Sequence, residues 1–500
     1  MNDLSVPHIT KESIFTVIVL CSIFYAVFSF YAFINPIIPY DGDDWQYLGT
    51  YRAPFPKWGG WNPTRVLPEV LMPLTGYIAA FCIYPIVHDY ILSITLTTSL
   101  IISGTITAYM YAIKGGVEKI LNLNGFMSTV LSVLFLILHF VFFMSRPQDN
   151  MYMFYTFNLT TIFYYLIPDM LNCSLVLIML KSLDFSATFV SYSNGKKSIF
   201  IIAIYFAIFS NLFCSEILGV FCFCMIVIDI FKLIQRKLSI KSFIQRQSVY
   251  LVIETLWGLS IFMELFGGRA HMLGGVKTFD FIGAVYSFCS LLRTINGAVL
   301  CGILIILFFF VFFLLEKDNL IINNKLLWKN IICLMFCFFP MVFVSLVAAA
   351  KSIPSYAGIP NSMYGVFFIL LLGITLALGF LVQKFTWVEI LMPLLVLFSV
   401  VTLMNSKPVA VSNTSQFLSQ TCVQIDQALI KQLTDADARG DNQVALHVPV
   451  WKGDNWPHSN GTVHALPKTL HRHGILTHSI QTTMVKDEHF FETYGIKIQK

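Results

Sequence analysis

The chain has 500 residues, of which 57% are hydrophobic and only 12% are charged, and its formal net charge is +5. Soluble domains carry about a quarter of their residues as charges, so this composition excludes an ordinary soluble protein. The bases are scattered along the sequence, which gives no indication of nucleic-acid binding.

Apolar runs of at least 18 residues recur along the chain. Each is long enough to cross a ~30 Å hydrocarbon core as a helix. The alternating segments of about ten residues that mark membrane β-barrels are not seen. We therefore predict an all-α polytopic membrane protein with eleven transmembrane helices. The predicted spans lie near residues 14–34, 90–113, 126–144, 159–180, two within 199–231, 248–266, 295–315, 329–349, 362–383 and 387–404.

Two apolar stretches need separate interpretation. Residues 199–231 are too long for one span, and the polar segment NLFCSE divides them into two. Residues 66–87 are interrupted by prolines, which favours a juxtamembrane or re-entrant segment that other parts of the protein cover. An alternative topology lets 66–87 cross and fuses 199–231 into one tilted span, which moves two lysines of loop 181–198 to the outside.

The distribution of lysine and arginine in short loops sets the predicted orientation. Loop 232–247 is the most basic, and we place it in the cytoplasm. Counting spans from this loop puts the N-terminus inside and the C-terminus outside. The chain then divides into a transmembrane domain, 1–404, and an extracytoplasmic C-terminal domain, 405–500.

The stretch 41–69, DGDDWQYLGTYRAPFPKWGGWNPTRVLPE, follows the first span and is unusually polar for the first 230 residues. It contains four acids, three bases and three tryptophans. One interpretation is an ordinary extracytoplasmic loop with tryptophans at the membrane interface. The other is an active-site loop, covering residues 35–65, that holds a carboxylate base over a lipid-linked substrate.

Transfer of a sugar from a lipid phosphate needs few protein groups. Cations stabilise the charge that develops on the leaving phosphate, and a nearby carboxylate deprotonates the acceptor hydroxyl. Asp43 and Asp44 are the candidate bases; their repulsion can separate their pKa values, and one of them can instead hold a divalent cation. The predicted substrate-binding residues, all on the outside face, are Trp45, Arg65, Glu69, Arg146, Asp149, Glu216 and Arg269.

Several of these residues also have plain structural interpretations. Arg65 and Glu69 stand four apart, so in a helix they can simply pair with each other. Arg146 and Asp149 can do likewise in a turn. Glu216 lies between two apolar runs, where an acid is a functional candidate by default, but it can also cap a helix.

The C-terminal segment 405–500 is polar, and its sequence predicts a small α/β unit. Residues 415–438 have helical spacing and end near Gly440, and residues 443–450 alternate as a strand does. A second helix is predicted over 464–473. We expect this unit to dock on the outer face of the transmembrane domain.

Two motifs carry a resemblance to a known family. The acidic pair after the first span resembles the polytopic glycosyltransferases of the GT-C class. The tail sequence LHVPVWKGDNWPHSNGTVHALPKTLHRHGI (446–475) is similar, in its DNWP and its TLxRHGI, to the serotype-converting O-antigen glucosyltransferases of enteric bacteria and their phages. The resemblance covers the whole architecture, but matching motifs occur only at 41–69 and 446–475.

The resemblance implies an enzyme of the bacterial inner membrane with a periplasmic C-terminus. Its donor would be undecaprenyl-phosphate glucose and its acceptor a lipid-linked O-antigen repeat unit, so that transfer alters the serotype. The class assigns the base role to Asp43 or Asp44. A nearer alternative is transfer of another lipid-linked sugar to lipid A or another surface polymer. A lipid-linked sugar transporter or flippase is the rival of a different class, although the internal repeat that transporters show is not visible.

Overall fold

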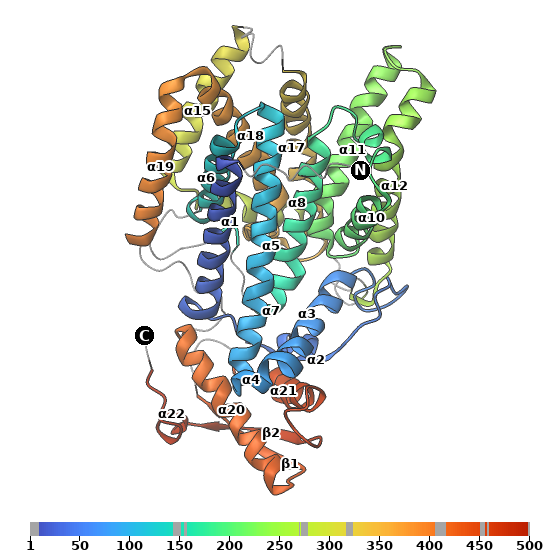
Figure 1. The fold of residues 1–500 in the computed structure, drawn as a ribbon. Coiled ribbons are helices and arrows are strands. Elements are labelled where there is room, and N and C mark those ends of the chain that lie inside the picture. Colours follow the sequence, from blue (N-terminus) through green and yellow to red (C-terminus); the bar gives the residue numbers. More distant parts are fainter. Residues whose placement is uncertain are drawn as a thin grey trace, which may run out of the picture.

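The computed structural model describes residues 10–143, 152–154, 158–269, 271, 279–316, 324–405, 417–450, 456–457 and 460–498. Arg146 and Asp149, two of the predicted substrate-binding residues, lie outside these ranges. Most of the described chain is helical, and the long helices lie side by side in a bundle (Figure 1).

Among the described residues, nine helical segments are long and apolar enough to cross a membrane. This confirms the prediction of an all-α polytopic fold, whereas the number of eleven crossings stays a prediction. The nine segments are α1 (Lys11–Ser29, prolonged by a π-helical turn to Ile34), α3 (Val66–Ile78, continuing to Val87 through α4, Tyr84–Val87), α5 (Tyr90–Leu121), α7 (Leu159–Thr161, continuing through α8, Ile167–Leu180), α11 (Leu212–Ile234), α12 (Ile240–Leu265), α15 (Gly297–Leu315), α17 (Lys325–Lys351) and α18 (Tyr364–Lys384).

Further helices complete the bundle. Nearly all of α18 is buried, so this helix runs through the centre of the bundle. The described part of the chain also contains α2 (Gly42–Gly49), α6 (Gly125–Val141), α9 (Phe185–Val190), α10 (Asn194–Ile208), α14 (Phe281–Leu292) and α19 (Thr386–Asn405).

Both unusual apolar stretches are helical in the structure. The stretch 199–231 is divided, as predicted, but the break lies at residues 209–211 rather than over the whole of NLFCSE, because α10 ends at Ile208 and α11 begins at Leu212. The Asn211 side chain caps α11 by accepting a hydrogen bond from the Phe213 amide at 3.3 Å, and Glu216 lies within this helix. The stretch Val66–Val87 is a run of helix long enough to span a membrane despite its prolines. Its re-entrant character therefore stays a prediction.

The tail, residues 417–498, is a small α/β unit built from α20 (Ser419–Arg439), β1 (Gln443–Pro449), α21 (Asn460–Arg472), β2 (Gln481–Asp487) and α22 (Phe490–Thr493). The two strands pair in parallel, with Gln443 opposite Gln481, and α21 forms the crossover between them. Both predicted helices and the first strand are confirmed. Strand β2 was not predicted, since its short polar sequence does not show the alternation of a half-buried strand.

The tail lies at one end of the bundle, beside α2, the end of α3 and the beginning of α5 (Figure 1). The basic hairpin between α11 and α12 lies at the opposite end (Figure 1). Loop 41–65 and the tail thus lie at the same end of the protein, whereas the side of the membrane that this end faces stays a prediction.

Candidate functional site

The acidic turn, residues 41–44, opens the short helix α2. Asp41 is its N-cap, and the Asp41 carboxylate accepts a hydrogen bond from the Asp44 amide at 3.0 Å. The Asn158 side chain donates to the other Asp41 oxygen at 2.5 Å. The cap fixes the first turn of α2, and it thereby directs the two following carboxylates to different surroundings.

Asp44 is completely buried, and its carboxylate is saturated with donors. The backbone amides of Tyr40, Leu159 and Thr160 donate to it at 2.7, 3.3 and 2.6 Å, and the Thr160 hydroxyl donates at 2.5 Å. Burial, followed by the neighbouring Asp41 carboxylate, raises the pKa of Asp44 to about 8. Asp44 therefore ties the loop to the beginning of α7 and has no face open to a substrate.

Asp43, the adjacent residue, is exposed. Within the described part of the chain its carboxylate takes part in no hydrogen bond or ion pair. Partial covering of the carboxyl group raises the pKa of Asp43, and Asp41 adds to this effect, while the guanidinium groups of Arg269 and Arg65 act against it. Asp43 is thus a free carboxylate within the electrostatic reach of two cations.

Each of these arginines is held by its own contacts. Arg65 precedes the first turn of α3, and its guanidinium lies over the Tyr164 ring, 5.2 Å from the centroid. The backbone amide of Arg269 donates to the Trp61 carbonyl at 3.1 Å, which attaches the end of α12 to loop 41–65. Two arginines more than 200 positions apart are thereby held within electrostatic reach of Asp43.

Glu69 holds the loop together through its contacts and is not exposed at the surface of the loop. It pairs with Arg52 at 2.7 Å, and it also accepts hydrogen bonds from Asn62 at 2.7 Å and from the Tyr164 hydroxyl at 3.1 Å. The predicted alternative, an ion pair between Arg65 and Glu69, is therefore wrong. Three non-local donors compete for the Glu69 oxygens and occupy them.

Trp45 corrects another prediction. Its ring is fully buried and stacks on Tyr90, with the centroids 6.5 Å apart and the planes 16° apart. It is a core residue and cannot form a surface on which a sugar lies. The exposed tryptophans of the loop are Trp58 and Trp61, which are 61% and 49% exposed.

Glu216 lies away from the acidic turn, within α11. It is buried, and the Ser345 hydroxyl of α17 donates to its carboxylate. Cys214, two residues earlier, directs its thiol at the backbone carbonyl of Tyr164, 3.6 Å away. The turn of α11 that carries Glu216 is thereby linked to Tyr164, whose hydroxyl donates to Glu69.

The tail motif TLxRHGI forms the contact with α2. The Thr469 hydroxyl donates to the Trp45 carbonyl at 2.5 Å, and Arg472 donates to the Thr50 hydroxyl at 2.7 Å. His473 is buried between the Leu48 carbonyl, 3.1 Å from its Nε2, and the Tyr90 hydroxyl, 2.6 Å from its Nδ1. The sequences of the acidic stretch 41–69 and of the tail motif did not predict that the two contact each other, because these contacts join residues more than 380 positions apart.

No convergent metal site is seen in the described ranges: no three His, Cys, Asp or Glu side chains there lie together in a way that could hold an ion. The chain matches no protein-family model, no curated protein and no solved structure. The site must accordingly be interpreted from its own geometry.

Proposed function

We propose that this protein is a membrane glycosyltransferase that uses a polyprenyl-phosphate sugar, with Asp43 as the general base. The resemblance of the two motifs favours glucose as the sugar, undecaprenyl phosphate as the carrier and an O-antigen repeat unit as the acceptor, so that the product changes the serotype. In this proposal the acidic turn and the tail face the periplasm of a bacterial inner membrane, and the basic hairpin faces the cytoplasm.

The observation that carries the proposal is the difference between two consecutive acids. The Asp44 carboxylate accepts four hydrogen bonds from other protein groups. The Asp43 carboxylate, by contrast, is exposed and lies near Arg65 and Arg269. A free carboxylate beside cations at the end of a helical bundle provides both groups that phosphate-linked glycosyl transfer needs.

The reaction can be written with these groups alone. The acceptor hydroxyl attacks the anomeric carbon, the bond between that carbon and the phosphate oxygen breaks, and Asp43 takes the hydroxyl proton. The bonding electrons leave with the polyprenyl phosphate, whose added negative charge Arg65 and Arg269 stabilise. The phosphate is already a good leaving group, so the scheme requires no general acid.

The test compares Asp43→Asn with the wild-type protein in transfer of glucose from undecaprenyl-phosphate glucose to O-antigen acceptor. Asparagine keeps the size of the side chain but cannot accept the proton, so the rate should fall by about 10²–10⁴-fold. Asp435→Asn is the matched control, because Asp435 is an exposed acid on α20 in the tail. Full activity of Asp43→Asn at a normal protein level would contradict the proposal.

A further inference from the structure

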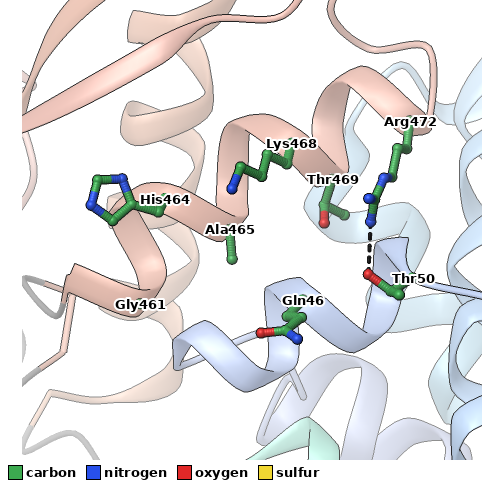
Figure 2. A pocket seen from close by; sticks show the side chains of 8 residues that line it. All are labelled: Gln46, Thr50, Gly461, His464, Ala465, Lys468, Thr469 and Arg472. Carbon is green, nitrogen blue, oxygen red and sulfur yellow. Dashed lines mark hydrogen bonds between the residues drawn. The ribbon is translucent and has the colours of Figure 1, made fainter.

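A groove of about 550 Å³ runs between α2 and α21, where the tail meets the acidic turn. Figure 2 shows the two helices facing each other, with Arg472 of α21 reaching Thr50 of α2 at one end. The groove is lined by Gln46, Thr50, Gly461, His464, Ala465, Lys468, Thr469 and Arg472.

The helices approach closely because glycines face the contact. A Cβ atom on Gly42 would lie 2.6 Å from the Gly461 backbone, and a Cβ atom on Gly49 would lie 2.4 Å from the Thr469 hydroxyl. Gly42 and Gly49 are two turns apart on α2 and therefore lie on one face of the helix. The groove is thus a built feature of the interface between loop and tail.

The charge of the groove is of one sign. Its lining includes Lys468, Arg472 and His464 and no acidic residue. Lys468 is exposed, and within the described residues its ammonium group has no hydrogen-bond or ion-pair partner. Such a lining attracts an anion, because no carboxylate neutralises the two permanent cations.

The remaining lining favours a saccharide over a lipid. Gln46 and Thr50 are exposed and present an amide and a hydroxyl, which match the hydroxyl groups of a sugar. The lining contains no large aliphatic or aromatic side chain of the kind that receives an acyl chain, and Ala465 is its one purely hydrocarbon side chain.

The position of the groove relates it to the proposed base. At about 100° per residue, Gln46 lies about 60° to one side of Asp43 around α2, and Tyr47 lies about 40° to the other side. Gln46 faces the groove, whereas Tyr47 contacts Asn62 and Tyr164 on the side of Arg65. Asp43 therefore stands between the groove and the side of α2 that faces Tyr164 and Arg65.

We infer that the groove binds an anionic saccharide, one that carries a carboxylate or phosphate group, as part of the acceptor. This inference rests on the proposed function, since it assigns the arginine side of Asp43 to the donor phosphate and the groove side to the acceptor. Lys468 and Arg472 hold the anionic group, and the hydroxyl that attacks the donor extends toward Asp43.

The test measures binding, so it does not depend on turnover. The full-length protein in phosphatidylcholine nanodiscs is titrated with tri-galacturonate and with its uncharged methyl ester. Tri-galacturonate should bind at least about tenfold more tightly than the ester. Lys468→Ala should weaken the binding of tri-galacturonate about tenfold, which is the contribution of one charge-assisted hydrogen bond. Lys468→Glu should weaken binding further.

Lys431→Ala is the matched control, because Lys431 is an exposed lysine on another helix of the tail. Equal affinity for acid and ester, or unchanged binding in Lys468→Ala and Lys468→Glu, would overturn the inference. So would loss of tri-galacturonate binding in nanodiscs that contain phosphatidylglycerol, since a lipid headgroup would then be the occupant. Asp43→Asn should bind tri-galacturonate normally while losing transfer, which separates failure of this inference from failure of the proposed function.

Discussion

The carboxylate of Asp44 receives two hydrogen bonds from Thr160, one from its amide at 2.6 Å and one from its hydroxyl at 2.5 Å. This pair of residues joins the loop after the first span to α7, 116 positions later in the chain. The helix start supplies unsatisfied amides, and an acid is the natural partner for them. The join holds the backbone that also carries Asp43.

Asp44→Ala should therefore destabilise the protein more than it affects the chemistry directly. Removal of the carboxylate leaves buried amides and a hydroxyl without an acceptor, which should lower the free energy of unfolding by about 2–4 kcal/mol. Thermal unfolding of the purified protein measures this loss. Asp43→Ala serves as the comparison and should unfold like the wild type, since an exposed carboxylate without partners contributes little. Equal stability of the two variants would contradict the assignment of a structural role to Asp44.

Much of this division could not be predicted from the sequence. The acidic pair after the first span was recognisable from its position, and the helices of the tail were recognisable from their spacing. Which of the two acids is buried depends on Leu159 and Thr160, which nothing in the local sequence connects to Asp44. Adjacent positions on a helix differ by about 100° in direction, so the two acids had to differ, but the sequence did not show which one faces inward.

The same limit explains the errors. The spacing of Arg65 and Glu69 suggested a helical pair, yet Arg52 reaches Glu69 from across the loop. Trp45 seemed suited to a sugar because it lies beside the acids, but the hydrophobic area of its ring favours the core when Tyr90 is available to stack on it. Local rules describe helices well and long-range partners poorly.

The ion pair of Arg52 and Glu69 offers a second measurement. Both side chains are largely buried, with 14% and 11% exposed. Glu69→Ala leaves the Arg52 guanidinium without its charged partner, so we expect a loss of about 3 kcal/mol in unfolding free energy. The double variant Arg52→Ala/Glu69→Ala should lose less than the sum of the single variants, because no unpaired charge then remains. Strict additivity in thermal or chemical unfolding would show that the pair does not stabilise the loop.

The buried His473 predicts a dependence on pH. Burial lowers the pKa of His473 to about 4 from its ordinary value of 6.5, and the nearby Arg472 cation adds to this effect. Both nitrogens of the neutral ring are hydrogen-bonded, since Nε2 donates to the Leu48 carbonyl and Nδ1 accepts from the Tyr90 hydroxyl. Between pH 6.5 and pH 4 the unfolded chain binds a proton that the folded protein does not, so stability falls as the pH is lowered through this range.

The loss should amount to about 3 kcal/mol, because one pKa unit corresponds to about 1.4 kcal/mol. His473→Gln removes the titrating group, and its melting temperature should change much less between pH 6.5 and 4 than that of the wild type. His489→Gln is the control, since this histidine side chain is 78% exposed. It should keep the wild-type dependence. A wild-type melting temperature that is constant over this pH range would contradict the role of His473.

The last prediction concerns the close approach of α2 and α21. A Cβ atom added at Gly49 would lie 2.4 Å from Thr469 Oγ1 and 3.0 Å from the Thr469 Cα. Because the backbone at Thr469 cannot yield as a flexible side chain would, Gly49→Ala must push α21 away from α2, at a cost of about 1–3 kcal/mol. The displacement would also break the hydrogen bond from Thr469 to the Trp45 carbonyl and open the groove.

Gly49→Ala should therefore make the tail more sensitive to a soluble protease and weaken tri-galacturonate binding. The control is Gly104→Ala on α5, where an added Cβ would meet nothing within 4 Å. That substitution should leave proteolysis and binding unchanged and the helix no less stable, since alanine has the higher helix propensity. If Gly49→Ala behaved like Gly104→Ala, the contact between α2 and α21 would not be what holds the tail beside the acidic turn.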